Sequence, residues 1–190
     1  EKVLGSRFQV IGVITTEDKP VGRHLKLTPN PVKVLAQKNN IPILEPNHYH
    51  LEPGVIGLVA AYGQIIKQET LDKFNGQIYN IHPSLLPKYR GPSPLQEQVL
   101  DGIVETGVTI IQLDALMDHG PIVAVAHDKI SPDDTWITLG DKLFAKGAEM
   151  FLKLEPRTYN LKPQNHALST YTKRLTRQDG FVPWEQFQPQ

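Results

Sequence analysis

Short apolar runs alternate along this chain with segments of helical spacing, and this alternation constrains the fold more than any other feature. The runs rich in valine and isoleucine, which we predict as strands, are 8–15, 55–61, 78–81, 108–113 and 122–126. The segments that we predict as helices are 31–38, 69–74, 94–100 and 137–154. Strands and helices in alternation predict an α/β fold, in which helices cover a mostly parallel sheet.

The length and composition favour a single soluble globular domain. A chain of 190 residues can form one well-buried core and a short tail, but not two large domains. Hydrophobic residues make up 39% and charged residues 21%, and the formal charge is zero, so the bulk charge indicates no partner. No segment approaches the roughly 20 apolar residues of a membrane span.

The chain contains no cysteine, which limits its chemistry. This absence excludes thiol nucleophiles, disulfides, thiolate zinc sites and iron–sulfur clusters, and it fits a cytoplasmic protein. His48 and His50 lie near Glu52, but in a proline-flanked loop without a further ligand. We therefore predict surface histidines there and no metal site.

Two segments stand out by charge. Residues 19–40 carry five lysines and arginines and no acid, and because their first half lacks an amphipathic stripe, a binding role and a solvated loop are equally consistent with them. From Pro156 onward periodicity fades, while prolines and a basic run accumulate, which indicates a linker that leaves the domain. The basic run consists of Lys173, Arg174 and Arg177.

The segment NIHPSLLPKYRG, residues 80–91, places two chemically versatile side chains at the end of a predicted strand. Asn80 offers an amide donor, and His82 can donate or accept a proton near neutral pH. Two residues apart on a strand, they point to the same face, at the end where α/β sheets bind ligands. Two such donors suit the oxyanion that forms when a carbonyl carbon becomes tetrahedral. The prolines that follow predict a fixed loop beside a preformed pocket.

Each of these residues also has a simpler interpretation when it is taken alone. Asn80 could cap the strand end, and His82 could be a hydrogen-bonded polar residue at the rim. Their co-occurrence with Ser84, two leucines and two prolines favours a functional site, although it leaves the reaction unnamed.

A third group is needed to hold the imidazole and to move protons. Asp118 is the best candidate, because Gly120 and Pro121 end the element and would leave its carboxylate at a turn that faces the pocket. Asp114, four residues earlier, is the alternative. We expect His119 to be a solvent-facing turn residue.

Three motifs and the spacing between them resemble the folate-dependent formyltransferase family. They are NIHPSLLPKYRG, then ETGVTIIQLD, then MDHGPIV. The resemblance implies a Rossmann-like formyltransferase fold, with helices on both faces of a mostly parallel sheet. It also implies that Asn80, His82 and Asp118 form the catalytic trio, and that 10-formyltetrahydrofolate is the co-substrate, with no metal.

Within the family, the resemblance is closest to the members that formylate methionyl-tRNA. KPVGRHLKLTPNPVKVLA resembles their tRNA-facing loop and helix, AYGQII a strand end in their folate pocket, and STYTKRLTRQDGFVPW the segment that leaves their catalytic domain. This implies transfer of a formyl group to the α-amino group of methionine on initiator tRNA, for translation initiation. The expected tRNA contacts are Arg23, Lys26, Lys33 and Arg90, although Arg90 could equally pair with an acid and fix the turn.

The resemblance places the folate along the loop after His82 and beside an earlier strand end. Apolar walls suit a flat pterin, and the backbone of a glycine can approach a ligand closely. The alternative is that the two leucines of the loop belong to the core. The expected folate contacts are Ser84, Leu85, Leu86 and Pro87, together with Ala61, Tyr62 and Gly63.

The resemblance also implies how the chain is divided. We expect an N-terminally incomplete catalytic domain over residues 1–155, a linker over residues 156–190 that leads towards an absent C-terminal domain, and a monomer. Other functions stay open. A formyltransferase for a small amine, such as glycinamide ribonucleotide or an amino sugar nucleotide, would not need the basic residues of 19–38. A non-catalytic folate- or RNA-binding fragment would show no turnover, and a folate-dependent hydrolase would use water in place of the amine.

Overall fold

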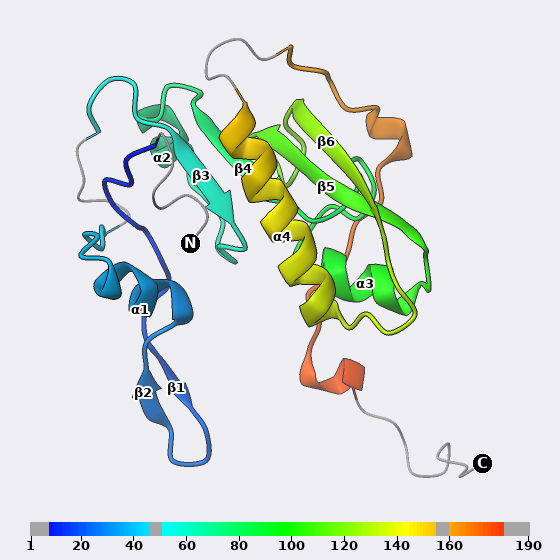
Figure 1. The fold of residues 1–190 in the computed structure, drawn as a ribbon, viewed down its shortest axis with the longest axis horizontal. Helices are drawn as coiled ribbons and strands as arrows, with labels where there is room; N and C mark the ends of the chain where they lie inside the picture. Colours follow the sequence, from blue (N-terminus) through cyan, green and yellow to red (C-terminus); the bar gives the residue numbers. More distant parts are fainter. Residues whose placement is uncertain (1–7, 46–50, 155–159, 181–190) are drawn as a thin grey trace.

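The computed structural model describes residues 8–45, 51–154 and 160–180. The elements in chain order are β1 (Lys19–Val21), β2 (Lys26–Thr28), α1 (Pro31–Lys38), β3 (Gly57–Ala60), α2 (Gln68–Lys73), β4 (Ile78–His82), α3 (Pro94–Leu100), β5 (Glu105–Gln112), β6 (Ile122–Lys129) and α4 (Trp136–Lys153), followed by the 3-10 turns His166–Leu168 and Arg177–Gly180. A four-stranded sheet in the order β3-β4-β5-β6 forms the main body, and the β1–β2 hairpin projects from it beyond α1 (Figure 1).

The α/β class is confirmed, but the four-stranded sheet is mixed. β3 and β4 are parallel, whereas β4–β5 and β5–β6 are antiparallel, so the prediction of a mostly parallel sheet is correct only for the first pair. β5 and β6 are joined by the short turn of residues 113–121, which suits antiparallel neighbours, whereas a parallel pair needs a crossover of about a dozen residues or more. The connection from β4 to β5, residues 83–104, is long enough for a crossover, and the apolar runs do not signal the direction that β5 takes.

Alternation along β4 separates the two faces of the sheet. Tyr79 and Ile81 point to the face that α4 covers, where they join the larger core cluster. Ile78 points to the opposite face and packs with Leu71 and Phe74 of the α2 region. Helices therefore lie on both faces, as expected. Asn80 and His82 share the parity of Ile78, and they are thus on the face away from α4.

Helix α4 is the main support of the sheet. Its start is fixed by a capping box between Thr135 and Thr138. Leu139, Leu143, Gly147 and Phe151 recur every four residues and form its buried stripe. Among the described residues, no helix combines the length and the apolar character that crossing a membrane requires.

Two parts of the sequence prediction differ from the structure at the N-terminal end. The run 8–15 forms only an isolated bridge, between Val13 and Ile43, instead of a strand. The hairpin of β1 and β2 lies within the basic segment, where no alternation of apolar and polar residues signals strands. Helices α1 and α3 have the predicted bounds.

We predict that Gly147→Val destabilises the fold, because a Cβ at position 147 would lie 2.4 Å from Ile81 Cγ2 and 3.0 Å from Val108 Cγ2. Both neighbours belong to central strands that cannot withdraw, so the free energy of unfolding should fall by about 1–3 kcal/mol. Asp141→Val, at an exposed position of the same helix, is the control for helix propensity. Equal urea midpoints for the two variants would contradict the prediction.

Candidate active site

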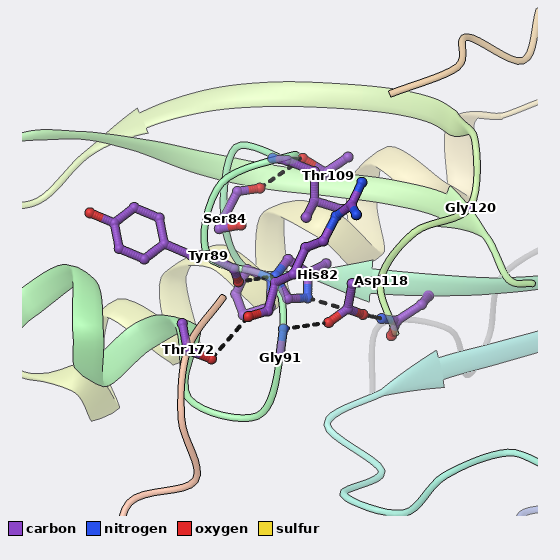
Figure 2. Close-up of polar contacts among 12 residues, drawn as sticks. His82, Ser84, Tyr89, Gly91, Thr109, Asp118, Gly120 and Thr172 are labelled. Carbon is purple, nitrogen blue, oxygen red and sulfur yellow. Dashed lines mark hydrogen bonds and ion pairs between the residues drawn. The ribbon is translucent and has the colours of Figure 1, made fainter. Parts of the chain in front are cut away.

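The three side chains expected to act together do meet in the structure. Asn80 and His82 come from the end of β4, and Asp118 comes from the turn between β5 and β6. Asn80 Nδ2 donates to Asp118 Oδ1 at 3.2 Å, and His82 Nδ1 lies 3.5 Å from the same oxygen. The backbone N–H of Gly91 donates to Asp118 Oδ2 at 2.8 Å. Figure 2 shows Asp118 reaching towards both His82 and Gly91.

The tautomer of His82 is set by the backbone of Tyr89. His82 Nε2 lies 2.8 Å from the carbonyl oxygen of Tyr89, and because a carbonyl can only accept, Nε2 carries the hydrogen. In the neutral ring, Nδ1 is then an acceptor that faces Asp118. The sequence prediction named Asp118 as the group that holds the imidazole and did not include this backbone carbonyl.

Burial sets the charge of His82. The residue is only 3% exposed, and this burial lowers its pKa below 6.5, although the nearby carboxylate of Asp118 and the hydrogen bond to Tyr89 act in the opposite direction. The ring is consequently neutral near pH 7. It can accept a proton on Nδ1, next to a carboxylate that stabilises the product.

The alternative carboxylate, Asp114, is engaged elsewhere. Its Oδ2 lies 2.7 Å from His119 Nδ1, and its Oδ1 accepts from the backbone N–H of Leu116. His119 is half-buried and stacks on His166, with ring centroids 4.1 Å apart, so the expectation of a solvent-facing residue is wrong. Asp118 is thus the carboxylate of the site.

The expected folate residues divide into buried and accessible ones. Ser84 and Leu86 are buried, and they hold the loop through Thr109, whose hydroxyl donates to Ser84 O at 2.7 Å and accepts from Leu86 N at 3.1 Å. Leu86 is therefore a core residue, as the alternative interpretation had it. Five others are exposed or half-buried: Ala61, Tyr62, Gly63, Leu85 and Pro87.

The expected tRNA residues do not form one surface. Arg23 is exposed between β1 and β2, Lys26 is exposed on β2, and Lys33 is half-buried on α1, where it binds Asp18 at 2.7 Å. Arg90 is 1% exposed and lies inside the loop after β4. The prediction that groups Arg90 with the tRNA contacts does not agree with this burial.

The guanidinium of Arg90 binds the chain that follows α4. It donates to Gln164 Oε1 from Nη2 at 2.6 Å and from Nε at 3.2 Å, and to Tyr171 Oη at 3.1 Å. Nη2 also lies 2.9 Å from His166 Nδ1. None of these partners is an acid. The alternative prediction, in which Arg90 pairs with an acidic residue, therefore does not agree with the structure either.

Residues 160–172 run back along the site and are called the strap below. The strap forms bridges between Tyr171 and Arg90 and between Lys162 and Ile122. Thr170 O accepts from Arg90 N at 2.9 Å, and Thr172 N donates to Arg90 O at 2.7 Å. The expectation of a linker over 156–190 stays a prediction, but this part of it contacts the loop after β4.

Two cavities in the described part of the chain lie apart from the trio. One, of about 460 Å³, lies between α2 and the end of β5 at Leu113–Ala115, and the other, of about 300 Å³, lies behind the loop at Leu85 and Tyr89. The trio lines neither of them. No three His, Asp or Glu side chains within residues 8–45, 51–154 and 160–180 are placed to hold a metal, and His48 and His50 lie outside these ranges.

Residues 3–154 match the family described as formyl transferase. The chain belongs to the formyl transferase family. The methionyl-tRNA formyltransferase of Chloroflexus aggregans is 39% identical to it over 97% of this chain and 64% of that protein. The methionyl-tRNA formyltransferase of Roseiflexus castenholzii is 41% identical over 97% of this chain and 63% of that protein. The chain thus spans less than two thirds of the length of these curated relatives.

Solved formyltransferases have the same fold. The N-formyltransferase from Helicobacter canadensis, in complex with folinic acid and dTDP-3-aminofucose, superposes with a TM-score of 0.73 at 27% identity, over 94% of this chain and 65% of that one. The phosphoribosylglycinamide formyltransferase from Bacillus halodurans superposes with a TM-score of 0.58 at 28% identity, over 77% of this chain and 79% of that one. The expected formyltransferase fold is therefore confirmed.

The lowered pKa of His82 predicts how stability depends on pH. Between the folded and unfolded pKa values, the unfolded chain binds more protons, so the free energy of unfolding rises with pH. The contribution of His82 should be complete above about pH 6.5 and be lost as the pH falls through the lowered pKa. Urea unfolding at several pH values measures this dependence. His82→Gln should remove this part of it, whereas exposed His127→Gln should keep it; an unchanged dependence in His82→Gln would contradict the prediction.

Proposed function

We propose that this chain transfers a formyl group from 10-formyltetrahydrofolate to the α-amino group of methionine on initiator tRNA. The observation that carries the proposal is the convergence of Asn80 and His82 on Asp118 Oδ1 at the end of β4. Family membership and the names of the curated relatives support this reaction.

Asn80 supplies the neutral donor for the oxyanion. One of its two N–H groups is used for Asp118 Oδ1. No hydrogen bond within the described part of the chain occupies the other, and the side chain is half-buried on the face away from α4. That N–H can stabilise the formyl oxygen as its carbon becomes tetrahedral.

His82 and Asp118 move the proton. When the amine attacks, a C–N bond forms, the carbonyl electron pair moves to oxygen, and the nitrogen must release a proton. Neutral His82 offers Nδ1 to accept it, directly or through Asp118, and the carboxylate 3.5 Å away stabilises the imidazolium. The protonated ring offers Nδ1–H to the oxyanion. The proton then passes to the folate nitrogen as its bond to the formyl carbon breaks.

The folate is proposed to lie where β3 and β4 end side by side. Val59 pairs with Asn80 in the parallel register, so residues 61–63 leave the sheet next to the trio. A side chain added at Gly63 would meet nothing within 4 Å, and Ala61 is exposed, so a flat ring can approach the backbone there. Leu85 and Pro87 supply the accessible apolar atoms of the loop.

The acceptor is proposed to bind through the β1–β2 hairpin. Arg23 and Lys26 are exposed there, beside Leu25 and Leu27, which are 72% and 64% exposed. Basic groups beside apolar ones suit a single-stranded acceptor end, because phosphates bind the charges and bases contact the apolar surface. We propose a cytoplasmic monomer. The alternative acceptor, an amino sugar nucleotide, is suggested by the solved Helicobacter canadensis protein.

We predict that Asn80→Ala lowers kcat/KM for formyl transfer by about 100-fold or more, equivalent to roughly 3 kcal/mol of lost oxyanion stabilisation. Transfer of labelled formyl groups to methionyl-tRNA measures this in the full-length protein. Gln178→Ala, which removes an exposed amide, is the control. Unchanged kcat/KM in Asn80→Ala would contradict this role, and a wild-type protein that binds folate without any turnover would favour the non-catalytic fragment.

We predict that Arg23→Ala lowers kcat/KM for methionyl-tRNA several-fold and reduces the slope of log kcat/KM against log salt by about 0.7–0.9, because one phosphate contact is lost. Lys153→Ala, at the exposed end of α4, is the control. If the wild-type protein transfers the formyl group to dTDP-3-aminofucose in preference to methionyl-tRNA, the proposed acceptor is wrong.

A further inference from the structure

We propose that Gln164 of the strap is a positioning residue for the formyl transfer proposed above. Its side-chain amide joins the turn that carries Asp118 to the loop that supports His82. The inference rests on the proposed function, and it places part of the catalytic apparatus beyond residues 3–154, the part of the chain that matches the family.

The amide of Gln164 is fully used. Its Nε2 donates to Asp118 O at 2.9 Å and to Gly120 O at 2.7 Å. Its Oε1 accepts both guanidinium bonds from Arg90, at 2.6 and 3.2 Å. A primary amide has two N–H donors and two acceptor lone pairs, so four contacts saturate it. At 5% exposure, water does not replace these bonds easily.

The Asp118 turn is held to the strap by this amide and by the stacking of His119 on His166, since its apolar side chains are largely exposed. Leu116 and Met117 are 60% and 52% exposed. The base of the turn is fixed, since Gln112 N donates to Pro121 O at 3.0 Å. Asp118 itself has φ +48, which is unfavourable for a residue other than glycine. Gln164 holds its backbone carbonyl, while Asn80 and Gly91 bind its carboxylate.

The other end of the amide holds the loop. Arg90 stands between Tyr89, whose carbonyl fixes Nε2–H of His82, and Gly91, whose N–H binds Asp118 Oδ2. A shift of Arg90 would move both backbone groups. Gln164 therefore sets the distance between Nδ1 of His82 and the carboxylate of Asp118, although it need not touch the substrate.

Two substitutions separate positioning from simple structural support. Gln164→Glu keeps an acceptor for Arg90 and adds an ion pair, but it turns a carboxylate oxygen towards the carbonyls of Asp118 and Gly120. Gln164→Ala removes all four bonds. Gln178→Ala removes an exposed glutamine from the same C-terminal segment and serves as the matched control.

The experiment uses the full-length protein and measures kcat and KM for methionyl-tRNA together with thermal unfolding. We expect Gln164→Glu to melt close to the wild type, with kcat at least 10-fold lower, KM for tRNA unchanged and an altered pH profile of kcat/KM. Gln164→Ala should lose activity and also stability. A folded Gln164→Glu protein with the kcat and the pH profile of the wild type would overturn the inference. A loss of kcat that is fully explained by the fraction of unfolded variant would overturn it as well.

A second measurement does not require activity. The imidazole of His82 can be titrated by NMR in the wild type, in Gln164→Ala and in Gln178→Ala. Displacement of Asp118 removes a carboxylate that favours protonation, so the midpoint of His82 should fall in Gln164→Ala alone. An unchanged midpoint would count against positioning. The two proposals can fail separately. If the wild type transfers no formyl group but the His82 midpoint still falls in Gln164→Ala, the proposed function is refuted, whereas Gln164 still positions Asp118 beside His82.

Discussion

One carboxylate joins the separate segments of the active site. Both oxygens of Asp118 accept hydrogen bonds, Oδ1 from Asn80 and Oδ2 from the backbone of Gly91, and Oδ1 also lies 3.5 Å from the ring of His82. These partners come from a strand and from the loop after it, whereas Asp118 comes from a distant turn. Because a carboxylate only accepts, Asn80 and Gly91 must both present an N–H towards it, and charge-assisted bonds of this kind are the stronger ones.

A buried cation explains why the strap belongs with the sheet. Arg90 is 1% exposed, and a charge removed from water is costly unless its donors are satisfied. Gln164, Tyr171 and Thr172 of the strap bind its side chain or its backbone. Without the strap, the guanidinium would remain buried without these partners, or the loop would open to solvate it. The loop after β4 and the strap are therefore expected to order together.

The sequence identifies the side chains proposed to react better than the groups that hold them. Asn80 and His82 could be found because their residue types and their period of two place donors on one face of a strand. Tyr89 contributes a carbonyl to the site, and a backbone carbonyl has no residue type that could signal it. Gln164 lies in a stretch without periodicity, where only the tertiary fold reveals its partners. The mixed sheet escaped prediction for a similar reason, since an apolar run predicts a strand but not the direction in which it pairs.

The trio proposed for the chemistry and the hairpin proposed for the acceptor occupy different kinds of surface in this fold. The trio depends on buried hydrogen bonds, so changes there disturb several segments at once. The β1–β2 hairpin is exposed, and its leucines, Leu25 and Leu27, are not buried against other described residues. Such a hairpin can vary without disturbing the trio. Solved relatives named for a nucleotide-sugar complex and for phosphoribosylglycinamide share the fold, with TM-scores of 0.73 and 0.58. Under the proposed function, we expect the hairpin, and not the trio, to decide which amine receives the formyl group.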